Sequence, residues 1–365
     1  MLIHKLDILD SLSRLCHRRN ANDTKEELVV KSKEESTFDI HTFRAKEKLF
    51  QGFRNDLVTA LRMAQRISRI SASMPRNTHP TESALAILAS KFPASTEAEC
   101  QRFLKARRGN LQTASEKLGE YMEWRLRCRL DYQDYVNDHP TNQTDAQDWN
   151  YAAKLALELE KQPNHNRHSY KKQAPNKIPK ATTLPQIVTV YYLDETNQTP
   201  CHTKDDTLIL HVLPAQVNKK IATPETYALA MAIYLDRKFD RYSSSDLASV
   251  FIDVRPGRGW ENPPAYTMMP FITHVSKLLH QYFPERLHQC IIYPLPKAAI
   301  WIWDMAKRFL DKSVVDAVLL IGGSDALTAA APIVKLSRFL DEEIIGRMEQ
   351  RRYDFFVTPL ESVAI

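Results

Sequence analysis

The residues of this chain that are able to do chemistry do not assemble into a known catalytic pattern. The GxSxG, HExxH, GxGxxG and P-loop motifs are all absent. Asp253 follows an apolar run, where a lone acid is more typical of a residue that caps the next turn than of a catalytic base. His165 and His168 have no cysteine nearby, so we interpret them as solvated. We therefore expect a protein that is not an enzyme, with no metal and no cofactor.

The most unusual segment is Tyr293–Leu310, which carries Trp301 and Trp303. If it is helical from Lys297, these two side chains point in nearly opposite directions, because successive helical residues turn by about 100°. Apolar side chains then cover more of the helix than a normal surface helix allows. Such a helix is either buried in the core, or meets a cavity on one side and a bilayer on the other, where exposed Trp is favoured.

Two groups of elements are expected around this segment, and the first is helical. Ala84–Phe92 has the pattern of a short helix. Thr96 and Glu99 form a capping box that predicts a second helix through residue 108. Asn110 then caps a third helix, which runs to about residue 129.

The second group alternates strands with helices, which predicts crossover connections and a largely parallel sheet. The first two strands are separated by a polar turn, which favours a hairpin. Pro224 and Pro270 each lie in the first turn of a predicted helix. The expected strands are Ile187–Leu193, Thr207–Val212, Ala248–Val254, Gln289–Tyr293 and Ala317–Ile321, and the later helices are Met269–Tyr282, Lys297–Arg308, Ala326–Ser337 and Leu340–Arg351.

Composition excludes several classes of protein. No apolar run approaches the ~18–20 residues of a spanning helix, and five scattered cysteines without a CxxC pair fit a reducing compartment. Net charge is +6, and residues 1–80 hold 15 Lys and Arg against 10 Asp and Glu. This basic skew fits an anionic membrane surface, or simply a solvated extension. Aromatic residues do not interleave with the basic ones, so we expect no nucleic acid partner.

Five segments together resemble the CRAL-TRIO lipid-transfer family, in matching order and spacing over residues 80–345. Gln101–Arg108 with Leu111–Arg125 is similar to the RFLRAR…WR motif, Ser249–Asp253 to the central strand, Tyr282–Leu287 to the YPER motif (with Phe283 in place of its tyrosine), Pro294–Leu310 to the gate helix, and Val318–Gly322 to the final strand and glycine.

The resemblance implies an α/β fold in which a helical N-terminal lobe lies beside a mostly parallel sheet. That sheet floors an apolar pocket, and a mobile gate helix at about 296–309 covers it. The implied ligand is one hydrophobic molecule, commonly a phospholipid, carried between membranes. The residues expected at this site are Arg107, Phe251, Met268, Phe271, Glu285, Ile300, Trp301, Trp303, Met305, Phe309, Val314 and Ala317.

One departure from the family concerns its phosphatidylinositol headgroup site. Members that bind this lipid use an Arg of the N-terminal lobe, the Glu of the YPER motif, and a Thr and a Lys before the last strand. Arg107 and Glu285 match, whereas Val314 and Ala317 stand at the Thr and Lys positions. Loss of the cation that faces the phosphate leads us to expect weak or no selectivity for phosphatidylinositol.

The resemblance divides the chain into a basic extension at 1–78, a helical lobe at 79–135, a lipid-binding domain at 145–345 and a tail at 346–365. We expect a cytoplasmic monomer that touches membranes transiently, with a phospholipid or another hydrophobic small molecule as its partner. The alternative is a regulatory module that docks on a membrane or a protein without transferring lipid. The basic extension gives this alternative some support.

Overall fold

All residues described below belong to one unit of the chain, Phe53–Ile365. The predicted extension at 1–78, most of the loop at 161–185, and Trp301, Met305 and Phe309 lie outside the described residues. The computed structural model describes residues 82–128, 130, 144–161, 183–194, 199–256, 265–297, 300, 303–304, 312–324, 326 and 328–357.

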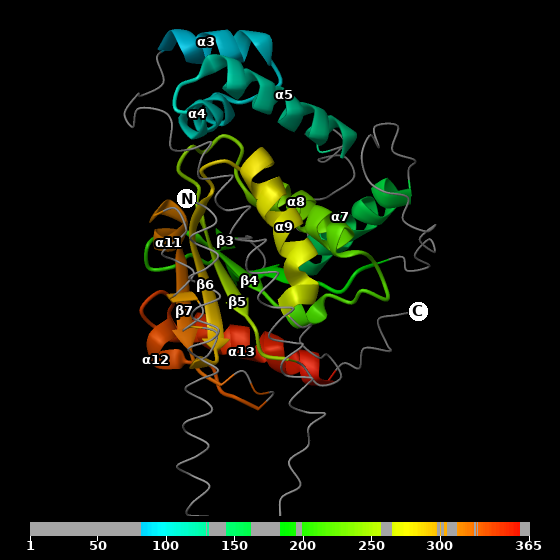
Figure 1. Ribbon diagram of the computed structural model, residues 1–365, viewed down its shortest axis with the longest axis vertical. Helices are drawn as coiled ribbons and strands as arrows, with labels where there is room; N and C mark the ends of the chain where they lie inside the picture. Colours follow the sequence, from blue (N-terminus) through cyan, green and yellow to red (C-terminus); the bar gives the residue numbers. More distant parts are fainter. Residues whose placement is uncertain are drawn as a thin grey trace, which may run out of the picture. The chain divides into compact units, whose positions relative to one another are not determined.

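Three helices open the described chain: α3 (Glu82–Lys91), α4 (Glu97–Ala106) and α5 (Leu111–Arg127), which are grouped together in Figure 1. The capping box is confirmed, because Thr96 Oγ1 accepts the backbone N–H of Glu99 at 3.1 Å and Glu99 accepts that of Thr96 at 2.8 Å. Asn110 caps α5 through a 3.0 Å bond from Thr113 N–H. The predicted starts of α4 and α5 are therefore confirmed.

A five-stranded sheet with the order β1-β4-β5-β6-β7 lies at the centre of the fold. Only the β1–β4 pair is antiparallel, and the other three pairs are parallel. The predicted α/β class with a mostly parallel sheet is thus confirmed. The strands are β1 (Val188–Val190), β4 (Leu208–Val212), β5 (Ala248–Asp253), β6 (Leu287–Leu295) and β7 (Val318–Gly322).

The predicted first strand is split in two. Its first part is β1, which pairs with β4 as expected, with Val188 opposite Val212. Its second part, β2 (Tyr192–Asp194), pairs instead with β3 (Thr199–Pro200) in a separate two-stranded sheet. The chain changes partner at Tyr191, whose side chain is buried on the sheet and whose carbonyl accepts the N–H of Cys201 at 2.7 Å.

Helices cover the two faces of the sheet unequally. On one face α7 (Asp145–Lys161), α8 (Pro224–Lys238) and α9 (Ala265–Tyr282) share a large buried cluster with β1, β4 and part of β5. Figure 1 shows these three helices side by side. On the other face, α12 (Ile333–Leu336) and α13 (Glu342–Val357) pack on β4–β7 in a second cluster, here called the C-terminal cluster.

Ion pairs also connect α13 to the end of β5. Arg255 is buried and donates to the Asp253 carboxylate at 2.6 Å and to the carbonyl of Ala329 at 2.8 Å. The same guanidinium forms an ion pair with Glu349 of α13. Asp253 also accepts the backbone N–H of Arg255 at 3.0 Å, so the predicted turn-capping role of this acid is confirmed.

The predicted helix Ala326–Ser337 is wrong over most of its length. Its described residues before Pro332 are not helical, and only Ile333–Leu336 is helical. Proline has no N–H to donate and disfavours a helical conformation at the preceding residue, so the helix begins after it. A short helix, α11 (Lys312–Ala317), precedes β7. In the described part of the chain, we find no helix long and apolar enough to span a bilayer.

Candidate functional site

Three parallel strands present a continuous apolar surface on the face opposite α13. Val250 lies beside Cys290, which lies beside Val318. In the next row Ile252 lies beside Ile292, and Ile292 beside Leu320. Neighbours in register project to the same side of a sheet, and alternate residues along a strand share a face. We call these six residues the apolar floor.

The floor is incompletely covered by the described helices. Five of its six side chains are only half-buried, and Val250 alone is fully buried. Ile252 and Cys290 pack at the edge of the large cluster, whereas Ile292, Val318 and Leu320 belong to neither cluster of the described residues. Both faces of a parallel sheet are normally covered, so a row of partly exposed aliphatic side chains indicates a surface for an apolar partner.

The floor carries no ionisable group that is charged at neutral pH. Its one titratable residue is Cys290, and burial raises the pKa of this thiol to about 11. An uncharged thiol behaves as a small apolar side chain. The surface is therefore suited to hydrocarbon rather than to a headgroup.

Of the predicted gate helix, Ile300 is the residue whose contact with the sheet is described. A Cβ atom added to Gly322 would lie 2.8 Å from Ile300 Cδ1, so the absence of a side chain at Gly322 makes room for Ile300. Gly322 follows Leu320 by two residues on β7 and so shares its face. Ile300 therefore lies at the edge of the floor, and Trp303, further along, is half-buried.

Two predicted site residues lie near the contact between α4 and the end of α9. Glu285, in a turn with φ of 60°, is 3.2 Å from Lys105 Nζ. Arg107 Nη1 is 3.3 Å from His280 Nε2. Burial, followed by the positive charges of Arg107 and Lys117, lowers the pKa of His280. Both predicted headgroup residues are thus engaged with protein groups.

The remaining predicted residues are distributed over several elements. Phe251 lies on the opposite face of β5 from the floor, fully buried in the C-terminal cluster. Phe271 of α9 is buried in the large cluster. Met268 lies in α9 and Val314 in α11, and Ala317 ends α11 and is half-buried. The structure therefore does not bring Phe251 and Phe271 together.

None of the six floor residues is among the site residues predicted from the sequence. Their strands read SVFID, CIIYP and VLLIG, which are apolar at nearly every position. Strands buried on both faces lack the alternation that would tell the two faces apart. The pairing register, together with Phe251 on the opposite face, is what identifies them.

Comparison with known proteins places a family match over this part of the chain. Residues 201–347 match the family model of the CRAL/TRIO domain, which includes β4–β7 and every floor residue. No curated protein matches the chain in sequence. Among solved structures, one described as "Crystal structure of Sfh5" is similar with a TM-score of 0.40 and 11% identity, over 68% of this chain and 82% of that chain.

Proposed function

We propose, on the premise that this chain belongs to the CRAL-TRIO family, that it binds one hydrophobic molecule on the apolar floor and transfers or presents it between membranes. CRAL-TRIO domains bind lipophilic ligands such as phospholipids. The observation that carries the proposal is the row of half-buried aliphatic side chains at Ile252, Ile292 and Leu320. A phospholipid is the ligand that we favour.

The energetics of binding follow from the chemistry of the floor. Moving hydrocarbon out of water stabilises it by ~0.8 kcal/mol per CH₂ group. Covering the half-exposed Ile292 and Leu320 removes further apolar area from water. An acyl chain of ordinary length therefore gains enough free energy to be held without any paired charge. The protein needs only to move the lipid between the membrane and the floor, without a chemical reaction.

Access to the floor is the task that we assign to the segment at about 296–309. Ile300 contacts the edge of the floor at Gly322, so movement of this segment would uncover Leu320 and its neighbours. The carrier would act as a cytoplasmic monomer and touch the membrane only while it exchanges lipid.

Mass spectrometry of lipid extracted from the purified full-length chain tests the proposal directly. We expect one equivalent of lipid per chain, without enrichment in phosphatidylinositol, since Val314 and Ala317 stand where the family has Thr and Lys. A protein free of lipid would instead favour the alternative of a docking module. Strong enrichment in phosphatidylinositol would contradict the expected lack of headgroup selectivity.

A matched pair of variants locates the ligand. Ile292→Asp places a carboxylate on the floor, where hydrocarbon cannot solvate it, and should reduce bound lipid at least about tenfold. Ile87→Asp is the control, because Ile87 is 50% exposed and lies on α3, which contributes no residue to the floor. Equal lipid content in the two variants would place the ligand elsewhere.

A further inference from the structure

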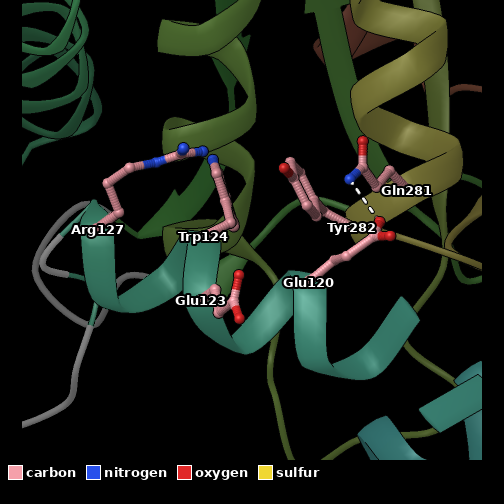
Figure 2. Close-up of a pocket in the computed structure, with 6 residues that line it drawn as sticks. All are labelled: Glu120, Glu123, Trp124, Arg127, Gln281 and Tyr282. Atoms are coloured by element: carbon pink, nitrogen blue, oxygen red, sulfur yellow. Dashed lines mark hydrogen bonds between the residues drawn. The ribbon is translucent and has the colours of Figure 1, made fainter. Parts of the chain in front are cut away.

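A cleft of about 340 Å³ lies between α5 and the end of α9, and it shares no residue with the apolar floor. Four of its lining residues are spaced along α5 by three or four positions, so they lie on one face of that helix. Figure 2 shows the residues that line it: Glu120, Glu123, Trp124, Arg127, Gln281 and Tyr282.

The Trp124 side chain presents an unusual feature in this cleft. It is 1% exposed, and its Nε1–H is buried with no hydrogen-bond partner among the described residues. The indole ring stacks on Tyr282 at 4.4 Å, with 12° between the planes, and its centroid lies 6.1 Å from that of Tyr121. Because the ring is clamped, the N–H cannot rotate toward another acceptor. A buried donor without an acceptor is costly and calls for an external partner.

Positive and negative groups occupy different parts of the cleft lining. Figure 2 shows the Arg127 guanidinium beside the Trp124 ring, the Glu123 carboxylate below that ring, and the Glu120 carboxylate next to Gln281. Glu120 accepts from Gln281 at 2.8 Å and from Lys117 at 2.6 Å, whereas Glu123 is exposed at the rim. The charges of the site are therefore separated rather than of one sign.

We infer that this cleft binds a small zwitterion whose oxyanion accepts hydrogen bonds from Trp124 Nε1–H and Arg127 and whose ammonium group faces Glu123. An oxyanion supplies the acceptor that the indole lacks, and its negative charge is stabilised by the guanidinium. An ammonium group next to Glu123 and the adjoining aromatic pair is stabilised by the carboxylate. Both a free phosphoamine and the head of an amine-bearing phospholipid have this chemistry.

An NMR titration with phosphoethanolamine tests the inference on the full chain. The indole N–H resonance of Trp124, identified by its loss in Trp124→Phe, should move downfield and saturate. Arg127→Gln and Glu123→Gln should each weaken binding about tenfold or more, since each removes one charge-assisted hydrogen bond. Both residues are exposed, so these variants should fold normally. Glu116→Gln, at an exposed position on the same helix, is the control and should bind as the native chain does.

The competing outcomes are distinct. An unmoved indole resonance overturns the inference, and so does equal binding of inorganic phosphate or of ethanolamine alone. If phosphoethanolamine releases the protein from vesicles that contain phosphatidylethanolamine, the ligand is the lipid head, and if it binds without that effect, the ligand is the free molecule. Either result supports the site. The test does not depend on the apolar floor, so a chain that carries no lipid would leave it intact.

Discussion

At the residue scale, His211 on β4 is the clearest case of a titratable group held in one state. It is buried, with Nδ1 at 2.7 Å from the Tyr191 hydroxyl and Nε2 at 3.5 Å from that of Tyr293. Burial, followed by the positive charges of Arg351 and Arg255, lowers its pKa to about 3. His211 is therefore neutral in the folded protein throughout the physiological pH range.

This neutral histidine makes the fold sensitive to acid. In the unfolded chain His211 takes up a proton near the ordinary pKa of about 6.5. Between about pH 6 and pH 4 the unfolded state thus binds more protons, so the free energy of unfolding falls as the pH falls, by at most about 1.4 kcal/mol per pH unit. His211→Gln should give a shallower slope in urea unfolding over this range. Identical slopes for the two proteins would contradict the assignment.

The residue scale also shows where sequence reasoning was limited. Arg107 and Glu285 were chosen by matching motifs, and the structure places both near the contact of α4 with α9. Phe251 was expected at the site from the resemblance of Ser249–Asp253 to the family's central strand, yet it packs under α13. Its neighbour Ile252 lies on the floor, and only the pairing of strands distinguishes the two.

At the element scale, helix starts were predicted better than strand partners. The caps at Thr96 and Asn110 are local, because each side chain bonds an N–H three residues away. β2 separates from β1 because it pairs with β3, a strand that lies within the predicted polar turn. α12 is short because it begins only after Pro332. Residues close together in the sequence determine where a helix starts, whereas contacts between distant residues determine which strands pair.

The role of the predicted gate helix can be tested by mutation. Trp303 is half-buried, and Trp301 lies outside the described residues. Changing both to Asp removes the aromatic groups that favour a membrane interface, so lipid transfer between vesicles should slow at least about tenfold. Circular dichroism should show an unchanged fold. Transfer at the native rate would count against a gate at about 296–309.

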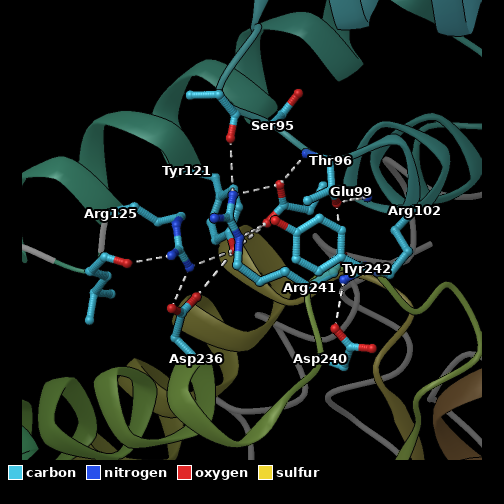
Figure 3. A network of polar contacts seen from close by, with 12 residues as sticks. Ser95, Thr96, Glu99, Arg102, Tyr121, Arg125, Asp236, Asp240, Arg241 and Tyr242 are labelled. Carbon is cyan, nitrogen blue, oxygen red and sulfur yellow. Dashed lines mark hydrogen bonds and ion pairs between the residues drawn. The ribbon is translucent and has the colours of Figure 1, made fainter. Parts of the chain in front are cut away.

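At the scale of the whole described unit, buried charges join α4 and α5 to α8 and the segment that follows it. Figure 3 shows this network. Arg125 of α5 forms an ion pair with Asp236 of α8, and both side chains are at most 5% exposed. Glu99 of α4 receives two hydrogen bonds from Arg241, at 2.8 and 2.9 Å. The Tyr121 hydroxyl lies 3.0 Å from Glu99 and 3.1 Å from Asp236, and so connects the two pairs.

Removal of one partner from this network should be costly. Asp236→Ala leaves Arg125 buried without its counter-ion, which typically costs about 3–5 kcal/mol. Asp341→Ala is the control, because its contact with Lys204 is 4.0 Å long and exposed, and such pairs contribute about 1 kcal/mol or less. Urea unfolding of the two variants measures the difference. Equal losses would show that the network does not hold the helices to the domain.

Much of the unit was predictable as a set of elements, but the surface to which we assign ligand binding was not. Alternating strands and helices indicated a parallel sheet, and the structure has three parallel pairs. The part of the sheet that remains partly exposed depends on where α8, α9 and α13 pack. The sequence of one apolar strand does not contain this information. The buried network at Asp236 was equally hidden, because its residues are far apart in sequence.

The packing of α13 on β5 leaves the two faces of the sheet unequally accessible. Arg255 connects β5 to α13 through its ion pairs with Asp253 and Glu349. On this face of the sheet, Phe251 and Ile291 are fully buried. If the apolar floor holds a lipid as we propose, that lipid has to enter and leave on the side of Ile300, because α13 covers the opposite face of the sheet.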